Sequence, residues 1–467
     1  MDTFFLVIFW LICTLGIGYS ILRFLFRRDW PFFFGEGLAL SYGTGIAAVS
    51  IWMAVMSLFG IRFSVPFIIL CFLPFILAAA FLHLNSSNKS RWGLNPTYFS
   101  FKKIAIKIGD LTLLEKFFIL AITIEVIYAF FRTFIKPMES YDAIAIYALK
   151  SKIFYLDRMI PSGFFKDFTR IVPHLEYPLL VPLAETYFYT FLGSLNDLLV
   201  KIIFPLYYAA LVAVFYSTVA RFLNRKASLF FTFLIATIPQ ITDFATNGYA
   251  DIPFSFYCSA SFFYLYLWLK QKKASVLVLS FILSLFAMWT KAEGLMFALI
   301  NAAVIIICMI KEKEIRAIGV IYAAISLFAI TAYILAWRSV GLAVNADFAG
   351  TQVPLISKII TGFKRIPAIL YEYQIQFFGP KKWNLIWVFF IIGFIAVFKK
   401  VFSKTMMPVT TAIILVLLGY SAVYMLSAAP QGLSWHLSTS GSRLFIHFVP
   451  IVVLWLALFF KELGLEI

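Results

Sequence analysis

The amino-acid sequence predicts an all-α polytopic membrane protein, with about 13 transmembrane helices and further helices lying outward at the membrane surface. Of its 467 residues, 63% are hydrophobic and 13% are charged, whereas a soluble domain is about half apolar and about a quarter charged. The mean hydropathy is +0.94. A water-soluble fold has too little interior to hide this much apolar surface, so we expect lipid around most of the chain.

Apolar runs of about 20 residues predict the spanning helices, because a helix rises about 1.5 Å per residue through about 30 Å of hydrocarbon. Four runs precede the first long polar loop: Phe4–Leu22, Leu38–Phe59, Ser64–Leu84 and Phe117–Ile135. The runs after it are Leu198–Val219, Ser228–Ile241, Ile252–Leu269, Ser275–Trp289, Leu295–Ile310, Ile315–Trp337, Leu385–Phe398, Met407–Met425 and Leu444–Phe460. The first run lacks a small-residue cleavage site, so we expect it to be a retained helix.

Six clusters of basic residues set the expected orientation, because lysine and arginine collect in cytoplasmic loops. They are Arg23/Arg27/Arg28, Lys89 to Lys116, Arg221/Arg225/Lys226, Lys270/Lys272/Lys273, Lys311/Lys313/Arg316 and Lys399/Lys400/Lys404. With all six in the cytoplasm, the long loops 136–176 and 338–384 face outward. The chain then divides into N-terminal transmembrane helices at 1–135 and a second module at 136–467 that carries both loops.

One apolar segment, Tyr177–Leu195, does not fit as a full span. Between the outward loop 136–176 and the inward cluster at Arg221 the chain crosses an odd number of times, and Leu198–Val219 already supplies one crossing. The carboxylate of Glu185 would also be costly on a lipid-exposed helix. We therefore expect this segment to be partly embedded at the outer surface.

The net charge of +17 and the 4 cysteines limit the functional classes. The charge has two explanations, the cytoplasmic bias of basic loops and an anionic ligand such as a lipid phosphate. The sequence has no basic domain interleaved with aromatic residues, so no nucleic-acid partner is expected. The cysteines are scattered through apolar runs and predict no disulfide or zinc site.

The loop 136–176 carries the first candidate functional residues. In the segment SYDAIAIYALKSK, Ser140 is placed to cap a helix and Asp142 lies in its first turn, where the helix dipole favours a carboxylate. Lys150 follows about two turns later, near the same face. Either the two charges hold an acceptor hydroxyl and a phosphate, or they belong to an interfacial amphipathic helix and extend to water.

The segment PHLEYPLLVP, where the chain re-enters the membrane, holds His174 and Glu176 between prolines. A histidine beside a carboxylate is typical of proton transfer or metal ligation. A hydrogen-bonded interfacial histidine explains the pair equally simply, and we favour that reading. With 4 histidines in the whole chain, a multi-histidine metal cage is not expected.

Two turns between apolar runs contain further ionisable residues. Asp251 lies in NGYADIP after an Asn-Gly turn, and it either caps the following helix or faces a functional cavity, roles that are compatible. Lys291 and Glu293 interrupt the apolar stretch around TKAEGL. Ionisable groups at membrane depth indicate a cavity or a substrate path, unless a short hairpin exposes them to water.

Arg443, in the segment SGSRLF, begins the last span from the outer side, against the usual charge bias. A guanidinium suits bidentate phosphate binding, although ordinary lipid headgroups would bind it too. The loop 338–384 adds five basic residues, Lys358, Lys364, Arg365, Lys381 and Lys382. Within this loop Ile356–Gln376 predicts a helix on the membrane that binds an anionic donor or any anionic lipid.

Taken in order, the segments SYDAIAIYALKSK, HLEYPLLVP, NGYADIP, TKAEGL and SGSRLF resemble the GT-C superfamily of membrane glycosyltransferases. The branch they are similar to is glycosyltransferase family 39, with its protein O-mannosyltransferases and lipid A aminoarabinose transferases. The segments look like the first outer loop with its acidic base, the His-Pro-x-Tyr-Pro motif, the second outer-loop Asp, the Lys-x-Glu-Gly turn and the late Arg. The resemblance covers residues 136–450 and departs from the family at Ala143, where many relatives have Glu, and at Leu175, where they often have Pro.

The resemblance implies an inverting glycosyltransferase that moves a sugar from a polyprenyl-phosphate donor to a lipid, glycan or protein acceptor at the outer membrane face. Asp142 would be the general base or acceptor-positioning carboxylate, and Asp251 would assist it. Residues 136–467 would form the catalytic module. The implied substrate- and phosphate-binding residues are Lys150, His174, Glu176, Lys291, Glu293 and Arg443. Such a reaction needs a base beside the acceptor and cations beside the leaving phosphate.

Two other functions stay compatible with the sequence. A transporter or flippase of lipid-linked sugars would have inverted repeats and broken helices; no repeat is evident, although Glu125 inside a span favours transport. A polysaccharide polymerase or ligase would also use basic outward loops. The expected partners are the lipid-linked sugar donor and membrane lipids, without a divalent metal. We expect the protein in a prokaryotic inner (plasma) membrane, with its active site on the periplasmic or extracellular side.

Overall fold

The structure is a computed structural model that describes residues 2–27, 30–87, 108–166, 172–341, 355–427 and 432–465. Within these ranges the chain forms helices and no strand, so the all-α prediction is confirmed. Arg28 and residues 89–107 of the second basic cluster lie outside the described ranges, as do loop residues 342–354.

Among the described residues, seven helices are long and apolar enough to cross a membrane. They are α1 (Thr3–Phe26), α2 (Phe34–Leu58), α5 (Leu113–Ile135), α8 (Ile203–Val219, with the turn before it), α11 (Asp251–Gln271), α14 (Arg316–Ser339, with the turn before it) and α20 (Met407–Leu426). An eighth span is formed if α21 (Leu433–Ile446) and α22 (Val449–Glu462), which are bent by 48°, count as one. These helices indicate a membrane protein.

The expected number of about 13 spans is not confirmed, because several apolar runs form shorter or broken helices. Pro239 divides the run Ser228–Ile241 into α9 (Arg225–Ala236) and α10 (Pro239–Phe244), since proline cannot donate a backbone hydrogen bond. The run Ser64–Leu84 is likewise divided into α3 (Val65–Leu70) and α4 (Leu73–Ser87). Three further apolar helices are shorter than the seven: α12 (Ala274–Thr290), α13 (Gly294–Lys311) and α19 (Ile386–Ala396).

The segment Tyr177–Leu195 contains α7 (Leu180–Leu192), which has 13 residues. At about 1.5 Å per residue this helix is too short for about 30 Å of hydrocarbon, in agreement with the expectation that it is not a full span. Nearly all of its side chains are buried, and it packs against α1, α2 and α6 (Leu149–Asp157). It is therefore covered mainly by other helices of the protein.

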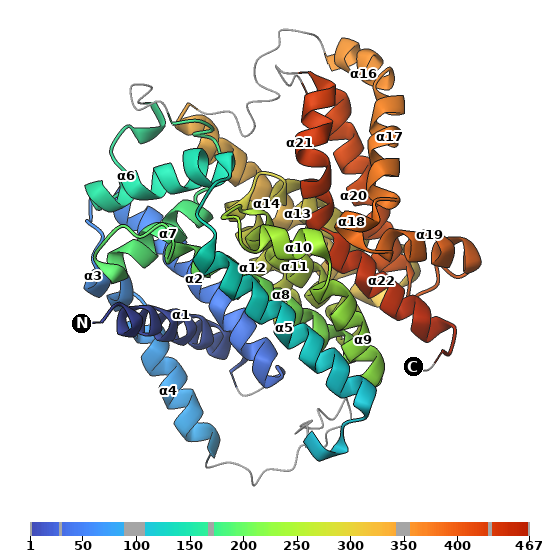
Figure 1. Ribbon diagram of the computed structural model, residues 1–467, viewed down its shortest axis with the longest axis horizontal. Coiled ribbons are helices and arrows are strands. Elements are labelled where there is room, and N and C mark those ends of the chain that lie inside the picture. Colours follow the sequence, from blue (N-terminus) through green and yellow to red (C-terminus); the bar gives the residue numbers. More distant parts are fainter. Residues whose placement is uncertain are drawn as a thin grey trace.

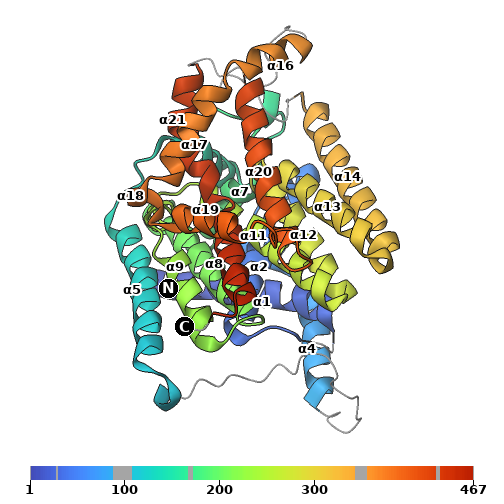
Figure 2. The same ribbon diagram turned by 90° about the vertical axis from the view of Figure 1, so that its right-hand side faces the viewer.

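The helices separate two ends of the molecule. Figures 1 and 2 show α6, α16 (Leu355–Phe363) and α21 at one end, and α4 with the start of α5 at the other. The 21 residues of α11 begin at Asp251 and reach Lys270 near their end, a separation of about 30 Å. We call the end that carries Arg221, Lys270 and Lys404 the basic face, and the end that carries Asp142, Asp251 and Lys291 the loop face.

Close packing joins the first two helices. A Cβ atom on Gly18 would lie 1.8 Å from the carbonyl oxygen of Ser41, and one on Gly45 would lie 2.1 Å from that of Thr14. Glycine at both positions lets α1 and α2 approach at backbone distance, as small residues do in membrane bundles. At the basic face, Arg221 binds the buried Glu36 carboxylate at 2.7 Å and so ties α8 to α2.

The segment expected to lie on the membrane, Ile356–Gln376, forms two helices, α16 and α17 (Ile366–Phe377), with a break at Lys364 and Arg365. The Arg365 guanidinium donates to the carbonyl oxygen of Tyr424 at 3.1 Å and also to that of Ser427. This arginine therefore fastens the start of α17 to the end of α20. Figure 2 shows α16 and α17 beside α20 and α21 at the loop face.

Candidate functional site

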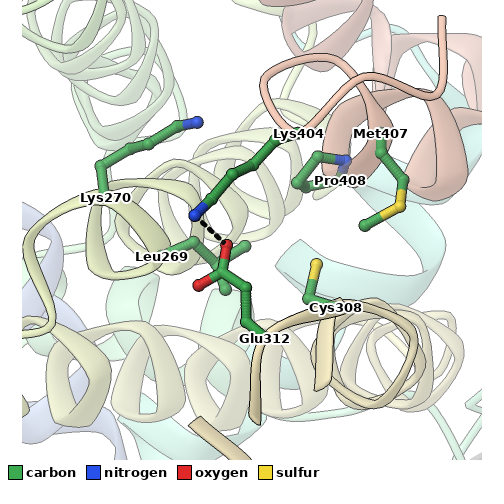
Figure 3. Close-up of a pocket in the computed structure, with 7 residues that line it drawn as sticks. All are labelled: Leu269, Lys270, Cys308, Glu312, Lys404, Met407 and Pro408. Atoms are coloured by element: carbon green, nitrogen blue, oxygen red, sulfur yellow. Dashed lines mark ion pairs between the residues drawn. The ribbon is translucent and has the colours of Figure 1, made fainter. Parts of the chain in front are cut away.

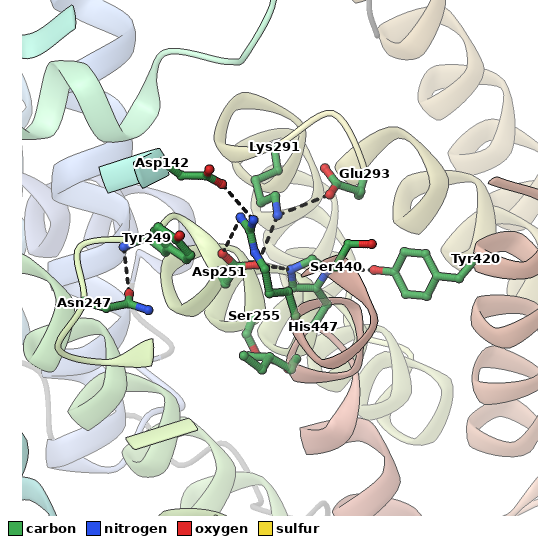
Figure 4. A network of polar contacts seen from close by, with 12 residues as sticks. Asp142, Asn247, Tyr249, Asp251, Ser255, Lys291, Glu293, Tyr420, Ser440 and His447 are labelled. Carbon is green, nitrogen blue, oxygen red and sulfur yellow. Dashed lines mark hydrogen bonds and ion pairs between the residues drawn. The ribbon is translucent and has the colours of Figure 1, made fainter. Parts of the chain in front are cut away.

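The carboxylate of Asp251 is the centre of a buried polar network at the start of α11 (Figure 4). Its side chain is 0% exposed. Lys291 Nζ lies 3.1 Å and His447 Nε2 lies 2.9 Å from Oδ1, and Arg443 Nη2 lies 3.2 Å from Oδ2. Because an unpaired buried carboxylate is strongly destabilising, these three side chains are what allow a charge at this position.

Arg443 joins two carboxylates from different parts of the chain. Its Nη1 lies 2.7 Å from Oδ2 of Asp142, while Nη2 contacts Asp251. The guanidinium carbon also lies 4.5 Å from the centre of the Tyr249 ring, a cation–π contact. The Nε atom is buried and has no hydrogen-bond partner among the described residues. One donor of this arginine is therefore left over for a further acceptor.

Lys291 and Glu293 occupy the tight turn between α12 and α13, where the loop face begins. Lys291 Nζ lies 3.2 Å from Glu293 Oε1 in addition to its contact with Asp251. Burial lowers the pKa of Lys291, but the two carboxylates outweigh it and hold the pKa above its ordinary value. Lys291 therefore stays charged. The turn itself requires glycine at 294, because a Cβ there would lie 2.4 Å from the backbone nitrogen of Met288.

The segment that carries Asp142 differs from the helix expected there. Ser140 does not cap it through its side chain, and residues Asp142–Ala148 form a π-helical turn before α6. A π-helical turn contains more residues than an α-helical one, so Asp142 and Lys150 do not share a face as regular helical spacing predicts. Asp142 contacts Arg443, and Lys150 does not take part in that pair. Turns of this kind occur frequently at functional sites.

Lys150 lies in a second cluster beside the first. Its ammonium group donates to the carbonyl oxygen of His174 and lies 6.0 Å from the centre of the Tyr177 ring. The side chain is 0% exposed. Burial lowers the pKa of Lys150 to about 7, although the nearby Glu176 carboxylate opposes the shift. An ammonium group has three donors and this one uses a single carbonyl, so the protonated form of Lys150 has unused hydrogen-bonding capacity.

His174 and Glu176 are hydrogen-bonded in this second cluster, with His174 Nδ1 at 3.0 Å from Glu176 Oε1. Tyr177 connects the two clusters. Burial raises the pKa of this phenol, and the charges of Glu293, Arg443, Asp142 and Glu176 all act on it. Residues predicted from four separate segments therefore lie within electrostatic reach of one tyrosine.

Asp251 does not have the capping role that was one of its two interpretations. Ala250 is the N-cap residue of α11 and no side chain caps the helix. The carboxylate points into the network in Figure 4. Asp243, at the other side of the Asn-Gly turn, pairs with Arg132 and takes no part in the network.

Three site residues were missed from the sequence. His447 is fully buried and links Asp251 to the Tyr420 hydroxyl, which lies 2.7 Å from His447 Nδ1. Its spacing of four residues after Arg443 puts the two side chains on one helical face, a signal that was present. Tyr147 is also fully buried, its hydroxyl has no partner among the described residues, and the charges of Asp251, Arg443 and Asp142 act on it. The sequence has no comparable spacing that would have identified Tyr147 or Tyr420 as site residues.

The whole arrangement combines carboxylates with cations and leaves buried donors unused. Asp142, Asp251 and Glu293 face Lys291 and Arg443, and the unused donors belong to Arg443, Tyr147 and Lys150. In the described part of the chain, no group of three or more His, Cys, Asp or Glu residues is placed to hold a metal ion. Such a site is equipped for acid–base chemistry and for binding an oxyanion.

Comparisons of the chain with protein-family models, with curated proteins and with solved structures find no match.

Proposed function

We propose that the protein is a GT-C-type glycosyltransferase that moves a sugar from a polyprenyl-phosphate donor to a hydroxyl acceptor, with inversion at the anomeric carbon. One observation carries the proposal: Asp142, Asp251, Lys291 and Arg443, which come from four distant segments, meet at one point. Charged groups at the end of apolar helices are costly and are retained mainly for function. The mixture of carboxylate and cation is what glycosyl transfer from a phosphate requires.

The proposed orientation places the basic face in the cytoplasm, because lysine and arginine collect there. Asp251 and Lys270 lie at opposite ends of α11, so the loop face then opens to the periplasmic or extracellular side. A polyprenyl donor is confined to the bilayer and presents its phosphate at the membrane surface. We propose that the network lies at that depth, in a prokaryotic inner membrane.

In the proposed reaction, Asp142 accepts the proton of the acceptor hydroxyl as its oxygen attacks the anomeric carbon. The bond between that carbon and the phosphate oxygen breaks, and polyprenyl phosphate leaves with the electron pair. Of the two carboxylates that contact Arg443, Asp142 is the more exposed, with 16% of its side chain exposed against 0% for Asp251. Asp251, held by Lys291 and His447, positions Arg443 and does not itself take the proton.

The leaving phosphate needs cations whose donors are not already used. Lys150 fits this need because its buried ammonium donates to one carbonyl oxygen. The free Nε of Arg443 and the free hydroxyl of Tyr147 supply two more donors. Charge-assisted hydrogen bonds from these groups would strengthen as negative charge develops on the departing oxygen.

The test is an assay of the purified protein with a panel of polyprenyl-phosphate sugars and a mixture of lipid and glycan acceptors. We expect release of free polyprenyl phosphate and a new glycosylated product with inverted anomeric configuration. A flippase would move the intact donor across a vesicle membrane without breaking the glycosidic bond. Transport without cleavage, for every donor tested, would contradict the proposal.

A further inference from the structure

A cavity of about 160 Å³ opens at the basic face, at the opposite end of α11 from the polar network. It is lined by Leu269, Lys270, Cys308, Glu312, Lys404, Met407 and Pro408 (Figure 3). A cavity needs about 10–15 Å³ by this measure to hold one water, so this one is large enough for a phosphate group. The lining comes from α11, α13 and the start of α20, together with the residues that flank them.

Positive charge is in excess around this cavity. Glu312 forms one ion pair with Lys272 at 2.8 Å and another with Lys404 at 3.0 Å. Lys270 lies within electrostatic reach of both lysines and of Lys461 at the end of α22. The charges that act on Lys270 are thus those of three other lysines and one carboxylate, Glu312. Because like charges at this spacing repel one another, the arrangement is stabilised by an added anion.

The remaining lining is apolar. Leu269, Met407, Pro408 and Cys308 contribute apolar groups to the lining, next to the charged side chains of Lys270, Lys404 and Glu312 (Figure 3). Free phosphate gains nothing from an apolar wall, whereas a phospholipid presents a phosphate next to its glycerol and acyl chains. Basic pockets between transmembrane helices on the cytoplasmic side are typical binding sites for anionic headgroups.

We propose that this cavity binds the phosphate of an anionic phospholipid in the leaflet at the basic face. Lys270 and Lys404 contact the phosphate oxygens, and Leu269 and Met407 contact the beginning of the acyl chains. The lipid would link α11, α13 and α20 at the end of the bundle opposite the polar network. The proposal is independent of the reaction assigned to the loop face.

The test measures Tm of the purified protein in a neutral detergent during titration with phosphatidylglycerol, phosphatidylcholine or inorganic phosphate. A ligand that binds only the folded state raises Tm. We expect a saturable rise with phosphatidylglycerol and none with the other two. No rise with phosphatidylglycerol would overturn the site, and an equal rise with inorganic phosphate would overturn the assignment to lipid.

Lysine variants test whether the rise in Tm comes from lipid bound in this cavity. Each juxtamembrane lysine contributes about 1 kcal/mol to anionic lipid binding, so K404A and K270A should each weaken the apparent affinity about fivefold. Lys404 has 73% of its side chain exposed, so its loss leaves the fold intact. K404R should keep most of the response, and K226A, on the same face but outside the cavity, should keep all of it. A wild-type response in both K404A and K270A would contradict the proposed site.

Discussion

The guanidinium of Arg443 and the carboxylate of Asp251 lie 3.2 Å apart, although 192 positions separate them in the chain. The contact forms where α21 meets the start of α11, and the same arginine reaches Asp142 at 2.7 Å. Arg443 therefore holds together the C-terminal helices, the centre of the chain and the first polar loop. Its loss would remove both a structural tie and a cation of the proposed site.

The variant R443A is expected to destabilise the protein by about 3–5 kcal/mol, because it leaves the buried Asp251 with an incomplete set of partners. The double variant R443A/D251N should lose less stability than the sum of the two single changes, since it removes the stranded charge as well. R132A, which breaks the partly exposed pair with Asp243, is the matched control and should cost at most about 1 kcal/mol. Thermal unfolding in detergent measures all four proteins. Additive losses in the double variant would contradict the coupling.

The variant D142N should reduce sugar transfer by about 10²- to 10⁴-fold, the usual contribution of a general base. The substitution keeps the size of the side chain, and the position is partly exposed, so Tm should change little. E139Q removes a carboxylate three residues away that pairs with Lys136 at the surface, and should leave transfer unchanged. A D142N enzyme with full activity would remove Asp142 from the proposed mechanism.

The site was predicted in part from the sequence because its residues share a recognisable position. Asp251, Lys291 and Arg443 each stand where an apolar run meets a polar turn, and such charges are rare enough to be informative. Lys150 was expected beside Asp142 on regular helical spacing, but a π-helical turn separates them, and one extra residue per turn leaves no clear mark in a sequence.

The number of spans was harder to predict, because it depends on where helices break and how they pack. Hydropathy measures the length of an apolar run, but it does not detect a break within one, such as the one at Pro239. It also does not distinguish a helix buried among other helices from one that faces lipid. α7 is surrounded by protein although its composition resembles that of a short span. Tertiary packing decides both cases.

Lys150 should make stability and phosphate binding respond to pH in opposite directions. Burial lowers its pKa to about 7 in the folded protein, against about 10.4 for an unfolded chain. Between these values the unfolded state binds the additional proton, so stability rises with pH above 7. Binding of a phosphate needs the charged form, so affinity for polyprenyl phosphate should fall over the same range.

The control for Lys150 is K150M, which keeps the length of the side chain without its charge. We expect its Tm to lose the rise between pH 7 and pH 9 that the wild type shows, and its phosphate affinity to be low at every pH. K152M changes a partly exposed neighbour that pairs with Asp197 and should retain both pH dependences. Identical profiles for K150M and the wild type would contradict the assignment.

Glu185 predicts a pH dependence of the opposite sign. Its side chain is fully buried in α7, and neither carboxylate oxygen has a hydrogen-bond partner among the described residues. Burial raises its pKa to about 8, so between the ordinary value of about 4.3 and 8 the folded state holds a proton that the unfolded state has lost. Its contribution to stability is complete below pH 4 and is lost as the pH rises toward 8.

The variant E185Q imitates the protonated carboxyl at every pH. It should match the wild type in Tm near pH 5 and exceed it increasingly toward pH 8, where the wild type must bind a proton from solvent to fold. The gain should reach at least about 1 kcal/mol, the lower range for a poorly satisfied buried polar group. E139Q at the surface should follow the wild type throughout. If E185Q were less stable than the wild type at pH 8, Glu185 would have to be charged and paired in the folded protein, and the burial of an unpartnered carboxyl would not describe this site.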